Sequence, residues 1–393
     1  MHEPSSWRVS SFKRACVTQA VKGTKSLLSR NIALALGLSG ALLGGASMAV
    51  AQDVAKDELK PAIMSPKASK SLLLDVEYAG DRLVAVGARG HIVYSDDQGV
   101  SWSQATVPVR QLLTAVDFVD AKHGWAVGHD SLILNTTDGG ETWKVQYRDP
   151  ALDDTDEDGF DLLEKPLMDV WFRDTQTGFA VGGYGLFLRT DDGGQTWEDL
   201  SDDIDNPDGF HYNALSEIKD TGLFLVGEMG TLYRSGDFGD TWETLTDSSP
   251  YDGSWFGVSG TGEQGGVLAW GLRGNVYRSN DFGDTWEQVK LRSPNNGPLG
   301  STLAGGQLLN DGRVVLVGVG GVVAVSDDHG HSFSVTVRPD RVALANAAGL
   351  KDGGIVLVGQ RGATDADSKG LSAQPSNAAT LPVPAATPEA TEE

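Results

Sequence analysis

The sequence contains a single cysteine, Cys16, so it can form neither a disulfide framework nor a cysteine-based zinc site. Basic residues are also scarce: 31 Lys and Arg stand against 54 Asp and Glu in 393 residues, for a net charge of −23. A protein this acidic is poorly suited to neutralising phosphates, so we expect no nucleic-acid partner. Long apolar runs are rare as well, because only residues 32–48 form one.

That apolar run belongs to an N-terminal segment with the parts of a secretory signal peptide. Residues 1–31 carry six basic side chains and only one acid, and the run ends at the small residues Ala49 and Ala51 around Val50. At 17 residues the run is short for an uncleaved membrane anchor. We therefore predict that residues 1–51 are a cleaved signal. The exported protein would then have no cysteine and a net charge of −28.

Between this segment and the C-terminus, one eight-residue motif recurs six times, with the pattern Ser/Thr-x-Asp-x-Gly-x-Ser/Thr-Trp. Successive copies start 41, 54, 45, 44 and 47 residues apart, and each follows two short apolar segments. A period in the forties with strand-like flanks is typical of β-propeller blades. The copies are residues 95–102, 136–143, 190–197, 235–242, 279–286 and 326–333, the last with Phe in place of Trp.

A seventh apolar pair at 355–368 lacks a complete motif. We therefore predict an all-β fold, a seven-bladed β-propeller over residues 52–368. An unpaired edge in the last blade would be exposed, so we predict that an N-terminal strand from residues 57–64 closes it. Residues 369–393 are mostly Ala, Pro, Thr and Glu, which predicts a disordered tail.

The aspartate of each motif is interpreted as structural. A carboxylate and a Ser/Thr hydroxyl can accept the backbone N–H groups of a tight turn, and the Trp can pack between blades. A residue that recurs once per blade fits a requirement of the fold better than a single active site. These aspartates are Asp97, Asp138, Asp192, Asp237, Asp281 and Asp328.

The apolar Val-Gly strand followed by this motif resembles the Asp-box, or bacterial neuraminidase, repeat. Over residues 70–362 it is similar to the photosystem II assembly and stability factor family. The resemblance implies an exported, non-catalytic, monomeric propeller in the periplasm or thylakoid lumen, without a small-molecule substrate. It also implies that the propeller binds a membrane-protein client during assembly.

The same resemblance implies an arginine-rich patch that contacts the client. In a propeller, the turns after the second strands and the connections between blades lie on one face, opposite the motifs. The arginines of matching type on that face are Arg89, Arg273, Arg341 and Arg361. Two acidic stretches, residues 149–166 and 201–210, fall on the same face at blades two to four. The face is therefore predicted to be basic on one half and acidic on the other; the alternative is that these arginines are scattered, solvated loop residues.

Two other functions stay open. The first is an accessory protein of an envelope transporter in a non-photosynthetic bacterium. The second is a sialidase-like glycoside hydrolase, for which Tyr184 and Glu228 are candidate catalytic groups. No Arg-Ile-Pro-type strand occurs in residues 52–80, so we expect that the protein is not an enzyme.

One loop has the spacing of the first half of a calcium-binding loop, with Asp154, Asp156 and Asp158 before Gly159. The twelfth position holds Lys165 rather than the expected glutamate, so a plain acidic surface loop is the alternative. The histidines are dispersed over different blades, and apart from this calcium site we expect no cofactor.

Overall fold

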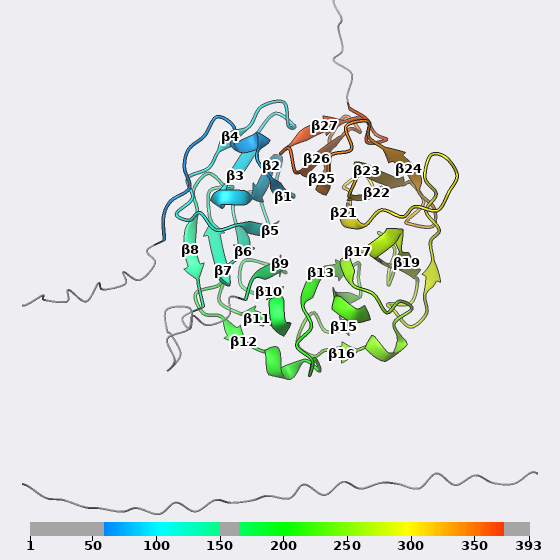
Figure 1. Ribbon diagram of the computed structural model, residues 1–393. Coiled ribbons are helices and arrows are strands. Elements are labelled where there is room, and N and C mark those ends of the chain that lie inside the picture. Colours follow the sequence, from blue (N-terminus) through cyan, green and yellow to red (C-terminus); the bar gives the residue numbers. More distant parts are fainter. Residues whose placement is uncertain (1–58, 150–164, 373–393) are drawn as a thin grey trace, which may run out of the picture. The chain divides into compact units, whose positions relative to one another are not determined.

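The computed structural model describes residues 59–149 and 165–372 of the chain. In these residues seven antiparallel sheets surround one central axis (Figure 1). Six sheets contain four strands each, and the seventh contains three. Each sheet follows the order of the chain, so that its first strand is innermost and its last strand outermost. The predicted seven-bladed propeller is therefore confirmed.

Each blade is a continuous stretch of sequence. Blades one to three consist of β1 (Leu73–Ala79), β2 (Arg82–Gly87), β3 (Ile92–Ser95), β4 (Ser103–Gln104), β5 (Leu113–Phe118), β6 (Gly124–Gly128), β7 (Leu132–Thr136), β8 (Lys144–Tyr147), β9 (Leu167–Phe172), β10 (Gly178–Gly182), β11 (Phe187–Thr190) and β12 (Glu198–Asp199). Blades four to seven consist of β13 (Tyr212–Ile218), β14 (Gly222–Gly227), β15 (Leu232–Ser235), β16 (Glu243–Thr244), β17 (Trp255–Gly260), β18 (Val267–Gly271), β19 (Val276–Ser279), β20 (Glu287–Gln288), β21 (Leu303–Leu308), β22 (Val314–Gly318), β23 (Val322–Ser326), β24 (Ser334–Val337), β25 (Leu344–Gly349), β26 (Ile355–Gly359) and β27 (Thr364–Ala366).

The second strand of each blade is almost wholly buried, because it has strands on both sides and neighbouring blades against both faces. This explains why sequences such as 314–318 (VVLVG) are apolar without alternation. The core consists of apolar clusters that lie mainly between adjacent blades. Stability therefore comes from contacts between neighbours around the ring.

Short 3₁₀ turns occur at regular places. After the second strand lie η2 (Ala88–Gly90), η4 (Gly183–Gly185), η6 (Glu228–Gly230) and η8 (Leu272–Gly274). The others are η1 (Ala68–Lys70), η5 (Ser201–Asp203) and η7 (Thr246–Ser248). Among the described residues, no helical segment has the length and hydrophobicity needed to cross a membrane.

The ring closes where blade seven packs against blade one. Tyr78 Oη donates to Gly349 O at 2.7 Å, and Asn346 Nδ2 donates to Asp75 Oδ1 at 2.5 Å. An apolar cluster shared by the two blades contains Val76 and Val356, among others. Closure thus uses side-chain packing and hydrogen bonds between innermost strands.

The fourth strand predicted from residues 57–64 is not part of blade seven, whose sheet is β25-β26-β27 in the described part of the chain. Residues 59–67 contact blade one instead: Ala62 N donates to Val107 O at 2.9 Å, and Ser65 N donates to Gln104 Oε1 at 2.7 Å. Pro61 and Pro66 lack the amide hydrogens that a paired strand would need, which disfavours a strand here. The chain reaches blade seven further on, at residues 68–70: Ser69 O accepts from Ala363 N at 2.9 Å, and Ala68 packs in an apolar cluster with Val356.

The C-terminal end of the described chain folds back toward blade six. Arg338 Nη1 donates to Gly370 O at 3.1 Å, and Ala366 forms an isolated bridge with Ser372. Residues 369–372 of the predicted tail therefore contact the propeller. The rest of the tail and the predicted signal peptide lie outside the described residues.

Candidate functional site

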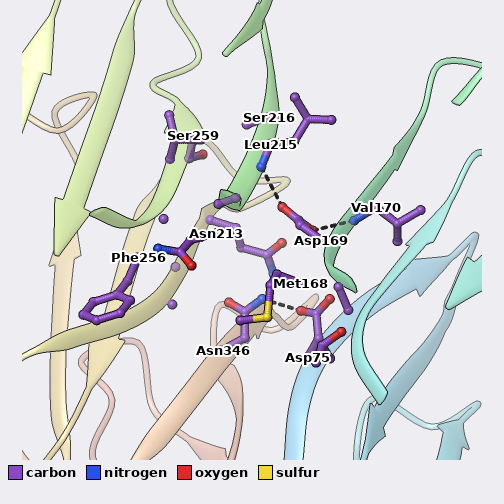
Figure 2. A pocket seen from close by; sticks show the side chains of 18 of the residues that line it. Asp75, Met168, Asp169, Val170, Asn213, Leu215, Ser216, Phe256, Ser259 and Asn346 are labelled. Carbon is purple, nitrogen blue, oxygen red and sulfur yellow. Dashed lines mark hydrogen bonds between the residues drawn. The ribbon is translucent and has the colours of Figure 1, made fainter. Parts of the chain in front are cut away.

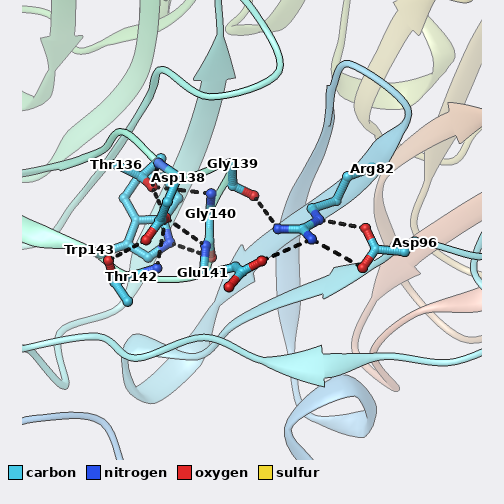
Figure 3. Close-up of polar contacts among 9 residues, drawn as sticks. All are labelled: Arg82, Asp96, Thr136, Asp138, Gly139, Gly140, Glu141, Thr142 and Trp143. Carbon is cyan, nitrogen blue, oxygen red and sulfur yellow. Dashed lines mark hydrogen bonds and ion pairs between the residues drawn. The ribbon is translucent and has the colours of Figure 1, made fainter.

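The repeated motifs join the third and fourth strands on one face of the propeller. In blade two, Asp138 Oδ2 accepts from the Thr142 hydroxyl at 2.5 Å, and Asp138 Oδ1 accepts from Thr142 N at 3.0 Å and the Thr136 hydroxyl at 2.8 Å (Figure 3). Gly140 N donates to the Thr136 hydroxyl at 3.1 Å. The same side-chain bonds recur at Asp97, Asp192, Asp237, Asp281 and Asp328. Each aspartate thus serves its own turn.

Arginines on this motif face are neutralised by acids. Arg82 of blade one donates to Asp96 at 2.6 Å, and it reaches blade two at Glu141 and at Gly139 O, both at 3.1 Å (Figure 3). The motif aromatic residues pack between blades; Trp143 meets Phe118 edge to face. Ion pairs of the same kind are formed by Arg173, Arg189, Arg234, Arg278 and Arg313. The charged side chains of this face therefore pair with one another, within a blade and between neighbouring blades.

The opposite face, which we call the strand-joining face, carries the turns after the second strands. In six blades the backbone of this turn bonds to the residue that precedes the blade's first strand; examples are Ala88 N to Leu72 O and Glu228 N to His211 O, both at 3.0 Å. Five of these turns place a non-glycine residue in the left-handed region: Arg89, Tyr184, Met229 and Arg273 have φ between 52° and 63°, and the blade-two turn has Asp130 and Ser131 there. Such residues cost energy to hold there. The motif turns show the same conformation at Gln98, Phe238, Phe282 and His329, so it is a feature of both faces.

All four arginines predicted to contact a partner lie on this face and are exposed. In the described residues, Arg89, Arg273, Arg341 and Arg361 take part in no ion pair within 4 Å, in contrast with the motif-face arginines. Asp340 is an acid close to this set, and the positive charges of Arg338 and Arg361 help to lower its pKa, although desolvation works in the opposite direction.

Two of the arginine turns pack against backbone segments that contain a further basic residue. The turn of Arg89 abuts the backbone of Arg110, because Gly90 packs against residues 109–110. The turn of Arg361 abuts Lys70, because Gly362 packs against residues 69–70. Arg273 lies apart on blade five, where its turn packs against Leu299. Sequence reasoning missed Lys70, since nothing in the repeat places residues 68–70 beside blade seven.

The two sialidase candidates lie on the other half of this face. Tyr184 packs edge to face on His211, with 4.7 Å between ring centroids. Glu228 Oε2 accepts from His211 N at 3.2 Å and lies 3.9 Å from His211 Nδ1. In the described part of the chain, no hydrogen bond joins Tyr184 to Glu228. The tyrosine and carboxylate of a sialidase-like nucleophile pair are therefore not connected.

The central channel forms a cavity of about 350 Å³ lined by the innermost strands of all seven blades (Figure 2). Asp75 Oδ2 accepts from Val116 N at 2.9 Å, and Asp169 Oδ2 accepts from Leu215 N at 2.8 Å. Each carboxyl therefore links its blade to the next. The channel also holds Glu77, Asp117 and Glu217, and no Lys, Arg or His lines the cavity in the described residues.

Burial dominates the chemistry of these carboxyls. Loss of hydration raises the pKa of Glu77 to about 8, that of Asp117 to about 7 and that of Asp169 to about 8. It also raises the pKa of Asp75. The sequence did not predict these channel carboxyls, because an acid that alternates with apolar residues in a strand indicates a position facing solvent. Only the closed ring turns that side of the strand into a channel.

The described residues contain no cluster of three or more potential metal ligands. The candidate calcium ligands Asp154, Asp156 and Asp158 lie outside the described residues, so that site stays a prediction. One hydroxyl–imidazole contact occurs in the described chain: Ser71 Oγ lies 2.9 Å from His91 Nδ1. Ser71 Oγ also donates to Ala68 O at 2.6 Å, and His91 is buried at 4% exposure. What distinguishes the strand-joining face is its four exposed arginines, Arg89, Arg273, Arg341 and Arg361, which form no ion pair within 4 Å in the described residues.

Comparison with known proteins points in the same direction. The sequence model of the family described as Photosynthesis system II assembly factor YCF48 matches residues 100–164 and 159–303. The chain is 36% identical over 85 residues to the Photosystem II assembly lipoprotein Ycf48 of Synechococcus sp. (strain CC9902), covering 22% of each protein. It is 45% identical over 49 residues to the chloroplastic Photosystem II stability/assembly factor HCF136 of Cyanidioschyzon merolae (strain NIES-3377 / 10D), covering 12% of this chain and 11% of that one. The matched stretches thus span about a fifth or less of these relatives.

Solved structures match over more of the chain but at low identity. YCF48 bound to a D1 peptide superimposes with a TM-score of 0.55 at 18% identity, covering 78% of this chain and 95% of that one. A streptogramin B lyase structure gives 0.58 at 12% identity, covering 78% and 95%. At these identities the matches show the propeller fold, which occurs in binding proteins and in enzymes alike.

Proposed function

This chain belongs to the Photosynthesis system II assembly factor YCF48 family, and from that membership we propose that it is a non-catalytic propeller that binds a membrane-protein client during assembly or stabilisation. The solved relative that holds a D1 peptide supports a client segment as the ligand. In an organism without a photosystem, the same surface would serve another envelope membrane protein, such as a transporter.

One observation carries this proposal: the arginines of the motif face form ion pairs, whereas the exposed arginines of the strand-joining face do not. On the motif face, six arginines are paired with acids, and on the strand-joining face the exposed arginines have no ion-pair partner in the described residues. Unpaired guanidinium groups on a rigid rim suit carboxylate recognition, since each can donate two parallel hydrogen bonds. We therefore propose Arg89, Arg273, Arg341 and Arg361 as client-binding residues and an acidic or carboxylate-ending segment as the ligand.

The proposed location follows from the same membership. Relatives named lipoproteins and chloroplastic factors support an exported or lumenal site of action. The basic and apolar N-terminal segment supports export to the periplasm, or to the thylakoid lumen in a photosynthetic organism. We also propose that the protein acts as a monomer.

The test replaces the three turn and loop arginines Arg89, Arg273 and Arg361 with Glu and captures clients from solubilised membranes of the source organism. We expect recovery of the client to fall at least about tenfold, because three favourable charges become unfavourable. Mass spectrometry identifies the client, and its identity separates a photosystem subunit from a transporter.

The control variant makes the same charge change where the proposal assigns no contact. Lys122, Lys144 and Lys219 are exposed and lie away from the strand-joining face. The triple Glu variant at these positions should recover the client as the native protein does. Equal recovery by both triple variants would contradict the proposed binding face.

A further inference from the structure

The strand-joining face has a second kind of chemistry on blades three and four. Here three side chains, which we call the aromatic–carboxylate cluster, lie together: Tyr184, His211 and Glu228. Tyr184 is 44% exposed although its backbone is left-handed, with φ of 58°. A bulky residue held in this conformation presents its ring outward at an energetic cost, and the fold retains that arrangement.

The cluster is fixed from both sides. His211 O accepts from Glu228 N at 3.0 Å, while His211 N donates to the Glu228 carboxylate at 3.2 Å, so the two residues hold each other. The loop that precedes His211 is closed by Asn206, which donates to Phe210 O at 2.9 Å and accepts from Phe210 N at 3.0 Å. The three groups are therefore preorganised rather than scattered.

Carboxylates predominate along the loop beside the cluster, and Lys165 precedes Pro166, whose carbonyl oxygen accepts from Gly183 N of the Tyr184 turn at 2.8 Å. Within the described residues, Glu228 has no ion pair with a lysine or arginine, and its side chain is 39% exposed. The neighbouring loop adds exposed carboxylates, with no lysine or arginine between positions 199 and 218; they are Asp202, Asp203, Asp205 and Asp208. An aromatic ring beside a carboxylate in a negative field is a site for an organic cation.

We propose that the aromatic–carboxylate cluster is a subsite for a lysine or arginine side chain of the client segment. The guanidinium or ammonium group would contact the Tyr184 ring and pair with the Glu228 carboxylate. This inference rests on the proposed function, because it assumes that the client's acidic part lies over the arginines. The face would then select a client segment by the order of its charges. A segment with acids at one end and a basic residue at the other could contact the arginines and the aromatic–carboxylate cluster at the same time.

The test uses two synthetic 20-residue peptides and purified full-length protein. One peptide carries four Glu at one end and two Arg at the other, joined by Gly and Ser; in the second, both Arg are replaced by the neutral isostere citrulline. Extended, 20 residues reach up to about 70 Å, so length does not limit binding. Both chain directions are made, and fluorescence anisotropy gives the affinities at low salt.

The native protein should bind the arginine peptide about three- to tenfold more tightly than the citrulline peptide. That preference should fall to about one in Tyr184→Ala and in Glu228→Gln, and persist in Tyr184→Phe, which keeps the ring. Glu287→Gln removes the same charge from an exposed position on the outer strand of blade five and should leave the preference intact.

The outcomes separate this inference from the function beneath it. Equal affinity of the native protein for the two peptides, together with loss of both in the Arg89, Arg273 and Arg361 to Glu variant, overturns the subsite and leaves the proposed function standing. Binding of both peptides that survives in that arginine variant contradicts the proposed binding face itself. No measurable binding of either peptide to the native protein counts against both.

Discussion

Two aspartates of neighbouring blades have opposite chemistry because their surroundings differ. Asp237 in the motif of blade four accepts the Thr241 hydroxyl at 2.6 Å and Thr241 N at 2.9 Å, and these bonds lower its pKa to about 2. Asp169 in the channel is half-buried, and its partial loss of hydration raises its pKa to about 8. The sequence shows the same residue type in both places, and only the tertiary environment separates a charged staple from a neutral acid.

At Asp237, replacement by Ala should lower the free energy of unfolding by about 1–2 kcal/mol, because the turn loses the acceptor for Thr241 and for the Ser235 hydroxyl. Urea unfolding measures the change. Asp247→Ala removes an exposed acid from η7 of the same blade and should shift stability by less than about 0.5 kcal/mol. Equal changes in the free energy of unfolding for the two substitutions would show that the motif carboxylate does not stabilise its turn.

Among the elements, the strands follow from the sequence and the chain's N-terminal path does not. Apolar segments ending in Val-Gly or Trp-Gly, six of them followed by a tight-turn motif, predict the second and third strands, because period and turn chemistry agree locally. The path of residues 59–70 depends on contacts with residues distant in the sequence. The side chain of Gln104 in β4 bonds to the backbone of Ser65 and Ile63, and no sequence pattern predicts these contacts. The arginines could likewise be assigned to loops, but their neighbours Arg110 and Lys70 could not be paired with them.

The contact between β4 and the N-terminal segment makes an element-scale prediction. Gln104 accepts from Ser65 N at 2.7 Å and donates to Ile63 O at 3.1 Å, so Gln104→Ala should release residues 59–67 and speed their cleavage in limited proteolysis. It should also lower stability by about 1 kcal/mol. Gln288 holds the matching place in β20 without such contacts, so Gln288→Ala is the control. Equal cleavage rates in the two variants would contradict the role of Gln104.

For the whole molecule, the channel connects ring closure to proton binding. The innermost strands meet there, and their carboxyls hold the next blade's backbone while no basic side chain lines the cavity in the described residues. A neutral carboxyl can stay in such a site at little cost, but several ionised carboxylates would repel each other across one cavity of about 350 Å³. Ionisation of these central carboxyls would therefore destabilise the folded propeller.

This arrangement predicts that the folded protein becomes more stable as the pH falls from 8 to 5. The folded channel keeps protons on Glu77, Asp117 and Asp169 up to a pKa of about 7 to 8, whereas the unfolded chain releases them near the ordinary values of 4.5 and 3.8. Unfolding in this window therefore releases protons, so the free energy of unfolding should drop by at least about 2 kcal/mol between pH 5 and 8. Urea titrations across that range measure this drop in the free energy of unfolding.

The double variant Glu77→Gln with Asp117→Asn keeps acceptors for Tyr78 N and Phe172 N and should flatten the dependence of stability on pH. The control Asp252→Asn, at an exposed position, should not. Stability that is constant or rises toward pH 8 in the native protein would contradict a channel of neutral acids.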